Sequence, residues 1–476
     1  MKRHFIFLVS LLLLFSVQAA IAQLRMPAIF TDHLVLQQQS EVALWGWAGP
    51  SEELIITPSW NKFDPMKTKT LNTGVWKTTL KTPVAGGPFT ITIKGGNTEL
   101  ELKDVLIGEV WICSGQSNME WSVNNGSPDA MEEMPKANYP EIRLFNVSKS
   151  ASDFPQTRGE GQWQLCSPET MKGFSSVGYF FGKKLYTDLK VPIGLINVSW
   201  GGTPAEVWTP KEKIDADPEL KQSATQLKEY AWWPKESGTV YNGMIRPVVP
   251  YGIAGAIWYQ GEGNTVAPST YQKLMKTMIE SWRSDFGKEF PFYFVQIAPF
   301  KYGRNYEGVL IREQQAKLLA VSKTGMVIIS DKVDDVQNIH PKFKKPVGDR
   351  LANYALGDTY RLPLLGYQSP VYKSMQVDKG KIRISFDYAQ IGLISEGGPP
   401  TQFTIAGEDK NFVPAVAKID GGTVVVSAKT VKNPVAVRFC WDNTSIPNLF
   451  NKEGLPVSAF RTDNWELDLS PIEEKK

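Results

Sequence analysis

The pattern of hydrophobic and polar positions changes twice along the chain. From about residue 24 to 104, short segments alternate between apolar and polar residues or are rich in β-branched residues. These segments are EVALWGWA (41–48), ELIITPSW (53–60), VWKTTLKT (75–82) and PFTITIKG (88–95). Because alternation with a period of two is typical of half-buried strands, residues 23–104 are predicted to form a small β-sandwich module.

Residues 105–362 show a different pattern, in which continuous apolar runs alternate with helical stretches. The predicted strands are VLIGEVWIC (105–113), IGLINVSW (193–200), IAGAIWY (253–259), FYFVQIA (292–298) and MVIIS (326–330). The predicted helices include residues 176–190, 271–287 and 313–323. Strands that are apolar throughout and separated by helices indicate an α/β domain with a parallel sheet covered on both faces. Ligands of such sheets bind beyond the carboxyl ends of the strands.

A strand-like pattern returns from about residue 365. It is clearest in KIRISFDY (381–388), GTVVVSA (422–428) and PVAVRFCW (434–441). Residues 363–476 are therefore predicted to form a second β-sandwich-like module that follows the α/β domain.

Residues 1–22 are predicted to be a secretory signal peptide. Lys2 and Arg3 precede an apolar stretch over 5–17, and Ala20-Ile21-Ala22 has the small-x-small form of a cleavage site. We therefore expect a periplasmic or secreted protein that begins at Gln23. No later stretch is long and apolar enough to predict a membrane span.

Composition narrows the class of protein further. The chain has 476 residues, 42% of them hydrophobic and 21% charged, which is typical of a soluble protein of two or three domains. The 52 basic and 49 acidic residues nearly balance, so no nucleic acid or anionic membrane partner is expected. The three cysteines are too few for a disulfide framework and lack metal-site spacing, so we expect buried thiols.

Polar segments follow four of the predicted parallel strands. They are SGQSN (114–118), WGGT (200–203), QGEGN (260–264) and DKVDD (331–335), the last followed closely by His340. The carboxyl ends of parallel strands meet at one edge of a sheet, so these segments are expected to lie together. They supply a hydroxyl, a histidine, carboxylates and N–H donors, which are the groups that serine-nucleophile acyl transfer requires.

Ser117 and His340 are the predicted nucleophile and base. His340 is the one histidine of the α/β region, since the other two lie in the leader and in the N-terminal β region. Ser117 is preferred over Ser114 because Gly115 permits a tight turn that presents the Ser117 hydroxyl at a helix start. The non-catalytic alternatives are a polar turn with a helix cap for the segment around Ser117 and a surface side chain for His340.

The oxyanion donors and the acid are less sharply defined by the sequence. The backbone N–H groups of Gly201 and Gly202 and the side-chain amides of Gln260 and Asn264 could each donate to an oxyanion. Glu262 could orient the histidine, bind a substrate hydroxyl or support another residue. An ordinary turn is the alternative for the two glycines.

Five segments together resemble the sialate O-acetylesterases of the SGNH-hydrolase superfamily. They are GEVWICSGQSNMEW (108–121), WGGTPAEVW (200–208), WYQGEGN (258–264), IREQQ (311–315) and IHPKFKKPVGDRLA (339–352). The resemblance runs from about residue 28 to 465. It implies a flavodoxin-like three-layer domain that removes O-acetyl groups from sugars or glycans without a metal or cofactor.

The resemblance also assigns roles to residues. Ser117 matches the nucleophile and His340 the base. Gly201 or Gly202 matches the oxyanion glycine, and Gln260 or Asn264 the amide donor.

The chain departs from the family at the acid. The family usually has an aspartate two residues before the histidine, where this chain has Asn338. An amide cannot stabilise the imidazolium that forms during attack. The acid is therefore expected to be Glu262, slightly preferred, or Asp335; a Ser-His dyad and a weak enzyme are the alternatives. Turn capping is the alternative role for Asp335.

Two other functions stay open at this level. The same chemistry could act on acetylated xylan, or the chain could be a secreted carbohydrate-binding protein with a degenerate esterase core. A cation in the pocket would favour the sialate carboxylate, and Arg246 or Arg312 could supply it.

Overall fold

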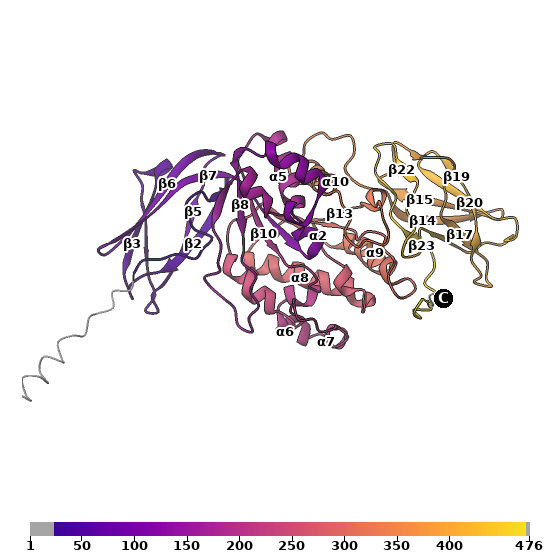
Figure 1. Ribbon diagram of the computed structural model, residues 1–476, viewed down its shortest axis with the longest axis horizontal. Helices are drawn as coiled ribbons and strands as arrows, with labels where there is room; N and C mark the ends of the chain where they lie inside the picture. The colour runs from indigo at the N-terminus through magenta and orange to yellow at the C-terminus, as the bar shows by residue number, and fades with distance from the viewer. Residues whose placement is uncertain (1–22, 473–476) are drawn as a thin grey trace, which may run out of the picture.

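The computed structural model describes residues 23–472, and these form three parts in a row along the long axis of the molecule (Figure 1). The predicted signal peptide lies outside the described residues and stays a prediction. Within residues 23–472, no helix combines the length and the apolar character that crossing a bilayer requires.

The N-terminal part consists of two small sheets. In one, β2 (Glu41–Trp47) pairs antiparallel with β5 (Val75–Lys81). The other joins β1 (Val35–Gln37), β3 (Glu53–Pro58), β4 (Met66–Lys69) and β6 (Gly86–Gly95) to the strand β7. Val42 and Leu44 of β2 are fully buried, whereas Ala43 and Trp45 are partly exposed, which is the predicted alternation.

Strand β7 (Thr98–Gly115) is shared by the N-terminal part and the central sheet. Its first half pairs antiparallel with β6, whereas residues 109–115 pair parallel with β10 on one side and 111–115 with β11 on the other. The predicted boundary between residues 104 and 105 therefore falls inside one continuous strand.

The central sheet has the order β13-β12-β11-β7-β10-β8-β9. Its strands besides β7 are β8 (Tyr139–Asn146), β9 (Trp163–Cys166), β10 (Ile193–Ser199), β11 (Gly255–Tyr259), β12 (Phe292–Val295) and β13 (Thr324–Val327). Neighbouring strands are parallel except β9, which is antiparallel to β8. The sheet is thus mixed and not wholly parallel as predicted, because the chain after β8 returns as the edge strand β9.

Helices pack on both faces of the central sheet. Trp111 and Cys113 of β7 join a core with residues of α5 (Ser176–Leu189) and α10 (Lys345–Tyr354). Val110 and Ile112 join the opposite core with residues of α8 (Tyr271–Phe286). Successive side chains of a strand point to opposite faces, so burial on both faces explains why these strands are continuously apolar.

The remaining helices are short, apart from α9. They are α2 (Ser117–Glu120), α3 (Pro128–Glu133), α4 (Pro168–Lys172), α6 (Lys211–Asp215), α7 (Pro218–Ala224) and α9 (Glu307–Lys317). Helix α9 begins six residues before the predicted start at residue 313. It also ends at Lys317, before the predicted end at residue 323. The helix was therefore predicted with the wrong bounds, because buried polar residues such as Arg312, Gln314 and Gln315 obscure its hydrophobic pattern.

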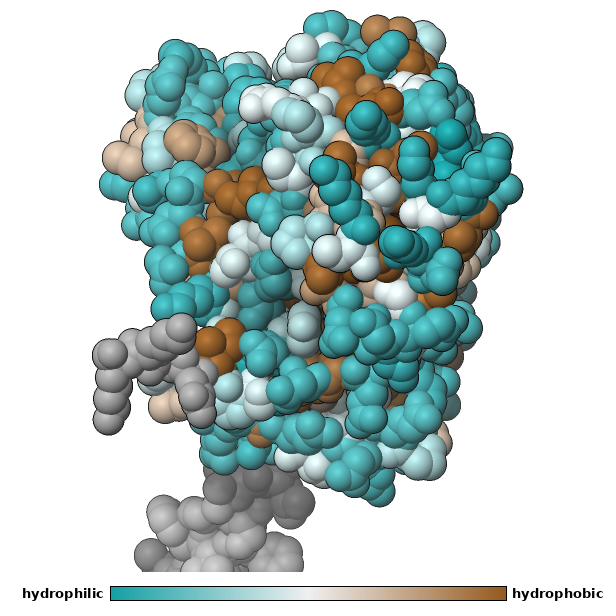
Figure 2. All heavy atoms as spheres, turned by 90° about the vertical axis from the view of Figure 1, so that its right-hand side faces the viewer, coloured by the Kyte–Doolittle hydropathy of each residue, from teal (hydrophilic) through white to brown (hydrophobic). Residues whose placement is uncertain are grey.

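The C-terminal part contains small antiparallel sheets around its own core. One sheet has the order β14-β15-β20-β19 and another β18-β17-β21-β23, and β16 pairs with β22. Their bounds are β14 (Val371–Asp378), β15 (Lys381–Asp387), β16 (Leu393–Ser395), β17 (Phe403–Ala406), β18 (Val413–Pro414), β19 (Val416–Asp420), β20 (Thr423–Ser427), β21 (Ala436–Phe439), β22 (Leu449–Asn451) and β23 (Phe460–Arg461). Hydrophilic residues predominate on the outer face of this end, with hydrophobic groups scattered among them (Figure 2).

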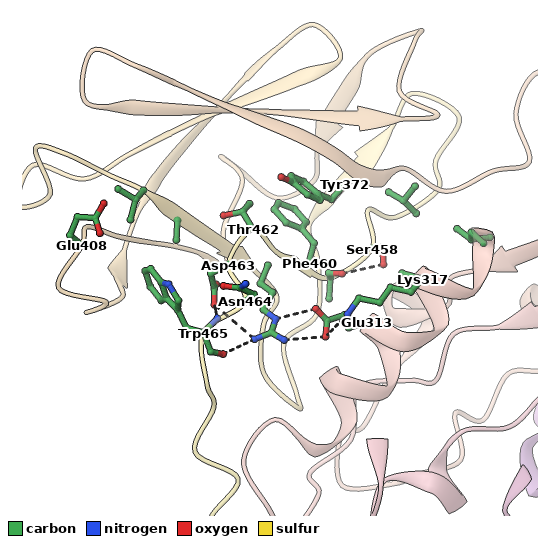
Figure 3. A pocket seen from close by; sticks show the side chains of 17 residues that line it. Glu313, Lys317, Tyr372, Glu408, Ser458, Phe460, Thr462, Asp463, Asn464 and Trp465 are labelled. Atoms are coloured by element: carbon green, nitrogen blue, oxygen red, sulfur yellow. Dashed lines mark hydrogen bonds and ion pairs between the residues drawn. The ribbon is translucent and has the colours of Figure 1, made fainter. Parts of the chain in front are cut away.

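An ion pair joins this C-terminal part to the central domain. Arg461 of β23 donates from Nε and Nη2 to the two carboxylate oxygens of Glu313 on α9, at 3.0 and 3.3 Å. Figure 3 shows Glu313 on its helix, facing the β module. A cavity of about 850 Å³ lies between α9 and the β module at this contact. The three cysteines are buried and unpaired, which confirms the prediction of buried thiols.

Candidate active site

Ser117 lies at the start of α2, directly after the carboxyl end of β7. The turn between them requires Gly115, which has φ +136°; a Cβ there would lie 2.2 Å from the carbonyl oxygen of Tyr259. The neighbouring Gln116 N–H donates to that same carbonyl at 3.0 Å. The nucleophile candidate is thus held between β7 and β11 at the edge where ligands of such sheets bind.

The structure brings Ser117 and His340 together. His340 Nε2 and Ser117 Oγ are 2.9 Å apart, although 223 residues separate them in the chain. The imidazole also stacks on Trp121, with ring centroids 4.2 Å apart and planes at 28°. This is the hydrogen-bonded contact that a nucleophile and its base need.

Neither predicted acid contacts the imidazole. Asp335 is exposed and accepts a hydrogen bond from Gln337 N at 2.8 Å, so its carboxylate caps a turn. Glu262 points elsewhere, to Asn118. Asn338 does not take the place of the acid, because its Oδ1 accepts from the backbone N–H of His340 at 3.0 Å. Within residues 23–472, no side chain donates to or accepts from His340 Nδ1.

A buried polar network lies behind the Ser117–His340 pair instead. Asn118 Nδ2 donates to Glu262 Oε1 at 2.8 Å and to the carbonyl of Ile339 at 3.1 Å. Lys344 Nζ donates to Asn118 Oδ1, also at 2.8 Å. Asn118 therefore connects the nucleophile turn, the histidine loop and two buried ionisable groups.

Burial governs the electrostatics of this network. It lowers the pKa of Lys344 to about 7 and raises the pKa of Glu262. It also lowers the pKa of His340, to about 4, and the nearby charge of Lys344 adds to the effect. His340 is consequently the neutral, proton-accepting form at any pH well above 4.

Gly201 adjoins Ser117, but its N–H is engaged. It donates to Glu120 Oε2 at 2.5 Å, and Glu120 also pairs with Lys149 at 2.5 Å. A Cβ on Gly201 would lie 3.3 Å from Ser117 Cβ, so the glycine is next to the reacting position. Gly202 has φ +82° and lies beneath Trp233, whose ring would be 2.2 Å from an added Cβ.

The two predicted amide donors are engaged beneath the site. Gln260 Nε2 donates to Asn264 Oδ1 at 2.7 Å, and Asn264 Nδ2 donates to Glu206 at 2.8 Å. Both amides are fully buried and neither lines the pocket over Ser117. Gln116 does line it, with its Oε1 held by Gly263 N at 3.1 Å.

Three residues of the site were missed by the sequence reasoning. They are Gln116, Asn118 and Lys344. The first two flank Ser117 in the GQSNM segment, where their amides could have been read as functional groups. The burial of Lys344 gives no signal in the sequence.

Arg312 and Arg246 do not reach the pocket. Arg312 is buried on α9 and donates to the backbone carbonyl of Asp442 in the C-terminal module. Arg246 is 3.8 Å from Asp285. The prediction that one of them binds a substrate carboxylate therefore has no support in this geometry.

The pocket over Ser117 has a volume of about 600 Å³. Ser117, His340, Gln116 and Gly201 line it and are buried or half-buried, so they form its floor. Lys228, Tyr230 and Trp232 also line it and are exposed, so they mark its mouth, and the half-buried Trp233 and Glu307 are part of the lining as well. A small ester group could reach the hydroxyl of Ser117 from this side.

Comparison with known proteins identifies the family. Residues 107–356 match the model of the family described as carbohydrate esterase, sialic acid-specific acetylesterase. The chain is 26% identical to the sialate O-acetylesterase of Pongo abelii, over 91% of this chain and 90% of that protein. It is 28% identical to that of Homo sapiens, over 81% and 80%.

A solved structure extends the similarity to the whole fold. A carbohydrate acetylesterase from Xanthomonas citri is 36% identical and superposes with a TM-score of 0.84. The match covers 93% of this chain and 100% of that chain. The resemblance noted in the sequence is confirmed, and the chain belongs to the family of sialic acid-specific acetylesterases among the carbohydrate esterases.

Proposed function

We propose that this protein removes O-acetyl groups from sialic acids with Ser117 as nucleophile and His340 as base. The observation that carries the proposal is the 2.9 Å contact between Ser117 Oγ and His340 Nε2 at the floor of an open pocket. The names of the curated relatives point to sialic acids as the substrate class.

The mechanism follows from the positions of these two groups. His340 Nε2 takes the proton of Ser117 as Oγ attacks the acetyl carbonyl carbon. The intermediate collapses, the sugar oxygen leaves with the proton from His340, and acetyl-Ser117 forms. Water then gives a proton to His340 and attacks the acetyl group, releasing acetate and restoring the serine hydroxyl.

The oxyanion requires N–H donors near Ser117. The N–H of Ser117 is free of intrahelical partners because it lies in the first turn of α2. Gln116 lines the pocket with its Oε1 bound by Gly263 N–H, and its Nε2 is the second donor in this proposal. Gly201 N–H becomes a third donor when the carboxylate of Glu120 leaves it.

The site works as a dyad in this proposal. Trp121 holds the imidazole by stacking, and the Asn338 cap fixes the backbone of the histidine loop. Replacing the acid of a serine triad by an amide lowers kcat by about 10⁴ in the best-studied case. We therefore expect a slow esterase compared with enzymes that keep the acid.

The proposal also covers the type of fold and the location of the protein. Without the outer strands β8 and β9, the five strands β10-β7-β11-β12-β13 have the order 2-1-3-4-5, which supports a flavodoxin-like three-layer SGNH-hydrolase domain between two β-sandwich-like modules. The charged, apolar and small-residue regions of residues 1–22 support export to the periplasm or the medium.

Acetate release from 9-O-acetylated sialic acid tests the proposed function. We expect release by the mature wild-type protein at a higher kcat/KM than from acetylated xylan. Preference for acetylated xylan would contradict the substrate class. No release from either substrate would favour a protein that binds sugars without cleaving them.

The pH dependence of kcat/KM provides a separate test of the base. The base acts only in its neutral form, so activity should be full above the pKa of His340 and fall as the pH drops through about 4. An acid limb near the ordinary histidine value of about 6.5 would contradict the buried, acid-free environment of His340.

A further inference from the structure

The mouth of the active-site pocket carries aromatic side chains that the proposed reaction does not use. Tyr230, Trp232 and Trp233, which we call the aromatic rim, belong to one irregular segment after α7. Trp232 is 67% exposed and Tyr230 41% exposed. Exposed aromatic groups gathered at one place on a soluble protein usually mark a site of contact with a ligand or partner.

The aromatic rim has a defined geometry. The ring centroids of Tyr230 and Trp233 are 4.4 Å apart, and those of Trp232 and Trp233 are 5.4 Å apart with planes at 79°. Trp233 packs over Gly202, and the carbonyl of Trp232 accepts from Trp200 Nε1 at 3.3 Å. The rim is thus fastened to the loop after β10 that also carries Gly201.

One cation adjoins the aromatic rim. Lys228 is the one lysine or arginine among the described residues that line the pocket. Neighbouring Glu229 pairs with Lys235, 3.2 Å away, and Glu307 across the pocket is already bonded to Arg304 at 3.2 Å. The ammonium group of Lys228 is therefore available to an anion entering the pocket.

We propose that the aromatic rim and Lys228 form a subsite for the anionic pyranose ring of the substrate, with Trp232 stacking on the ring and Lys228 pairing with its carboxylate. The inference rests on the proposed function and adds the groups that select the sugar. With the acetyl group at Ser117, the remainder of the sugar must lie toward the mouth of the pocket, where these side chains are. The apolar C–H face of a pyranose suits an exposed indole, and its carboxylate suits a lysine.

Binding of sialic acid itself tests this subsite without requiring turnover. Unacetylated N-acetylneuraminic acid is titrated calorimetrically into the mature wild-type protein, Trp232→Ala and Lys228→Met. We expect the Kd to rise about three- to tenfold in Trp232→Ala, as expected for one lost stacking contact. In Lys228→Met we expect a rise of about threefold, typical of a solvent-exposed ion pair. Phe63→Ala is the matched control, because Phe63 is also an exposed aromatic residue (91%) but lies in the N-terminal part.

Two further compounds, a binding ligand and a substrate, show which part of the sugar each side chain contacts. The methyl ester of the sialic acid lacks the carboxylate charge, so Lys228→Met and wild type should bind it with the same Kd. Ethyl acetate has no sugar, so all three variants should hydrolyse it within about twofold of wild type, whereas a general defect of the active site would slow it.

The outcomes separate the subsite from the reaction. Wild-type affinity in both Trp232→Ala and Lys228→Met would overturn the subsite, even if acetate is released. No binding of sialic acid to the wild type at millimolar concentration would do the same. Weaker binding in the variants would support it even if wild type fails to cleave the 9-O-acetylated sugar. That failure would count against the proposed function alone.

Discussion

Replacing Ser117 by alanine should lower kcat/KM for 9-O-acetylated sialic acid by about 10²-fold, because the oxygen that forms the acetyl-enzyme is lost from a site that already lacks the acid of a triad. His340 Nε2 contacts the Ser117 hydroxyl at 2.9 Å, and the variant loses the atom that attacks the ester. The measurement is acetate release by purified mature protein. A loss of less than about tenfold would contradict the assigned nucleophile.

Ser114→Ala is the matched control for this substitution. Ser114 lies three residues earlier and is fully buried, and its hydroxyl donates to the carbonyl of Val198 at 2.6 Å. Its loss should cost about 1 kcal/mol of stability and leave kcat near the wild-type value. A serine-reactive fluorophosphonate should label wild type and Ser114→Ala but not Ser117→Ala. Absence of labelling in wild type would point to a binding protein.

Replacing Lys344 by methionine should have the second largest effect. Lys344 is fully buried and meets Glu262 through the amide of Asn118. Removing the ammonium leaves the buried carboxylate without a compensating charge, which should lower the free energy of unfolding by about 3 kcal/mol, the lower end of the cost of breaking a buried pair. Denaturant unfolding at pH 6, below the pKa of about 7 that burial gives Lys344, measures this change.

The same variant should change the pH profile. The charge of Lys344 helps to lower the pKa of His340, so its removal should move the acid limb of kcat/KM from about 4 toward, but not up to, 6.5. The matched control is the double variant Lys344→Met/Glu262→Gln, which removes both charges. It should recover most of the lost stability and keep the shifted limb. A double variant as unstable as Lys344→Met would contradict the charge coupling of the two buried groups.

The central strands could be predicted because each is buried on both faces. Their apolar runs are unbroken, and β7, β10, β11, β12 and β13 all appear where these runs predicted them. Strands β8 and β9 could not be found in the same way. β8 begins with YPE and alternates poorly, and β9 has four residues, too few for a periodic signal.

In the candidate site, too, some residues could be predicted from the sequence and others could not. Ser117 and His340 could be predicted from a short segment with a glycine turn and from the scarcity of histidine in the domain. That neither Glu262 nor Asp335 reaches the imidazole could not be predicted, because it depends on how the loop over 331–340 folds back on itself. There Asp335 and Asn338 bond to the backbone of their own loop. The residue types alone do not show whether an Asp or Asn side chain bonds to the backbone of its loop or to the imidazole.

Because β7 belongs to two sheets, it limits where residues can be inserted into or deleted from this chain. The N-terminal sheet fixes the register of its first half and the central sheet that of its second half. Deleting one residue between the two halves would turn every later side chain of the strand to the opposite face, exchanging Trp111 with a neighbour from the other core. Most junctions between modules tolerate insertions and deletions, but this one should not. Gene families that carry this strand should vary in length elsewhere.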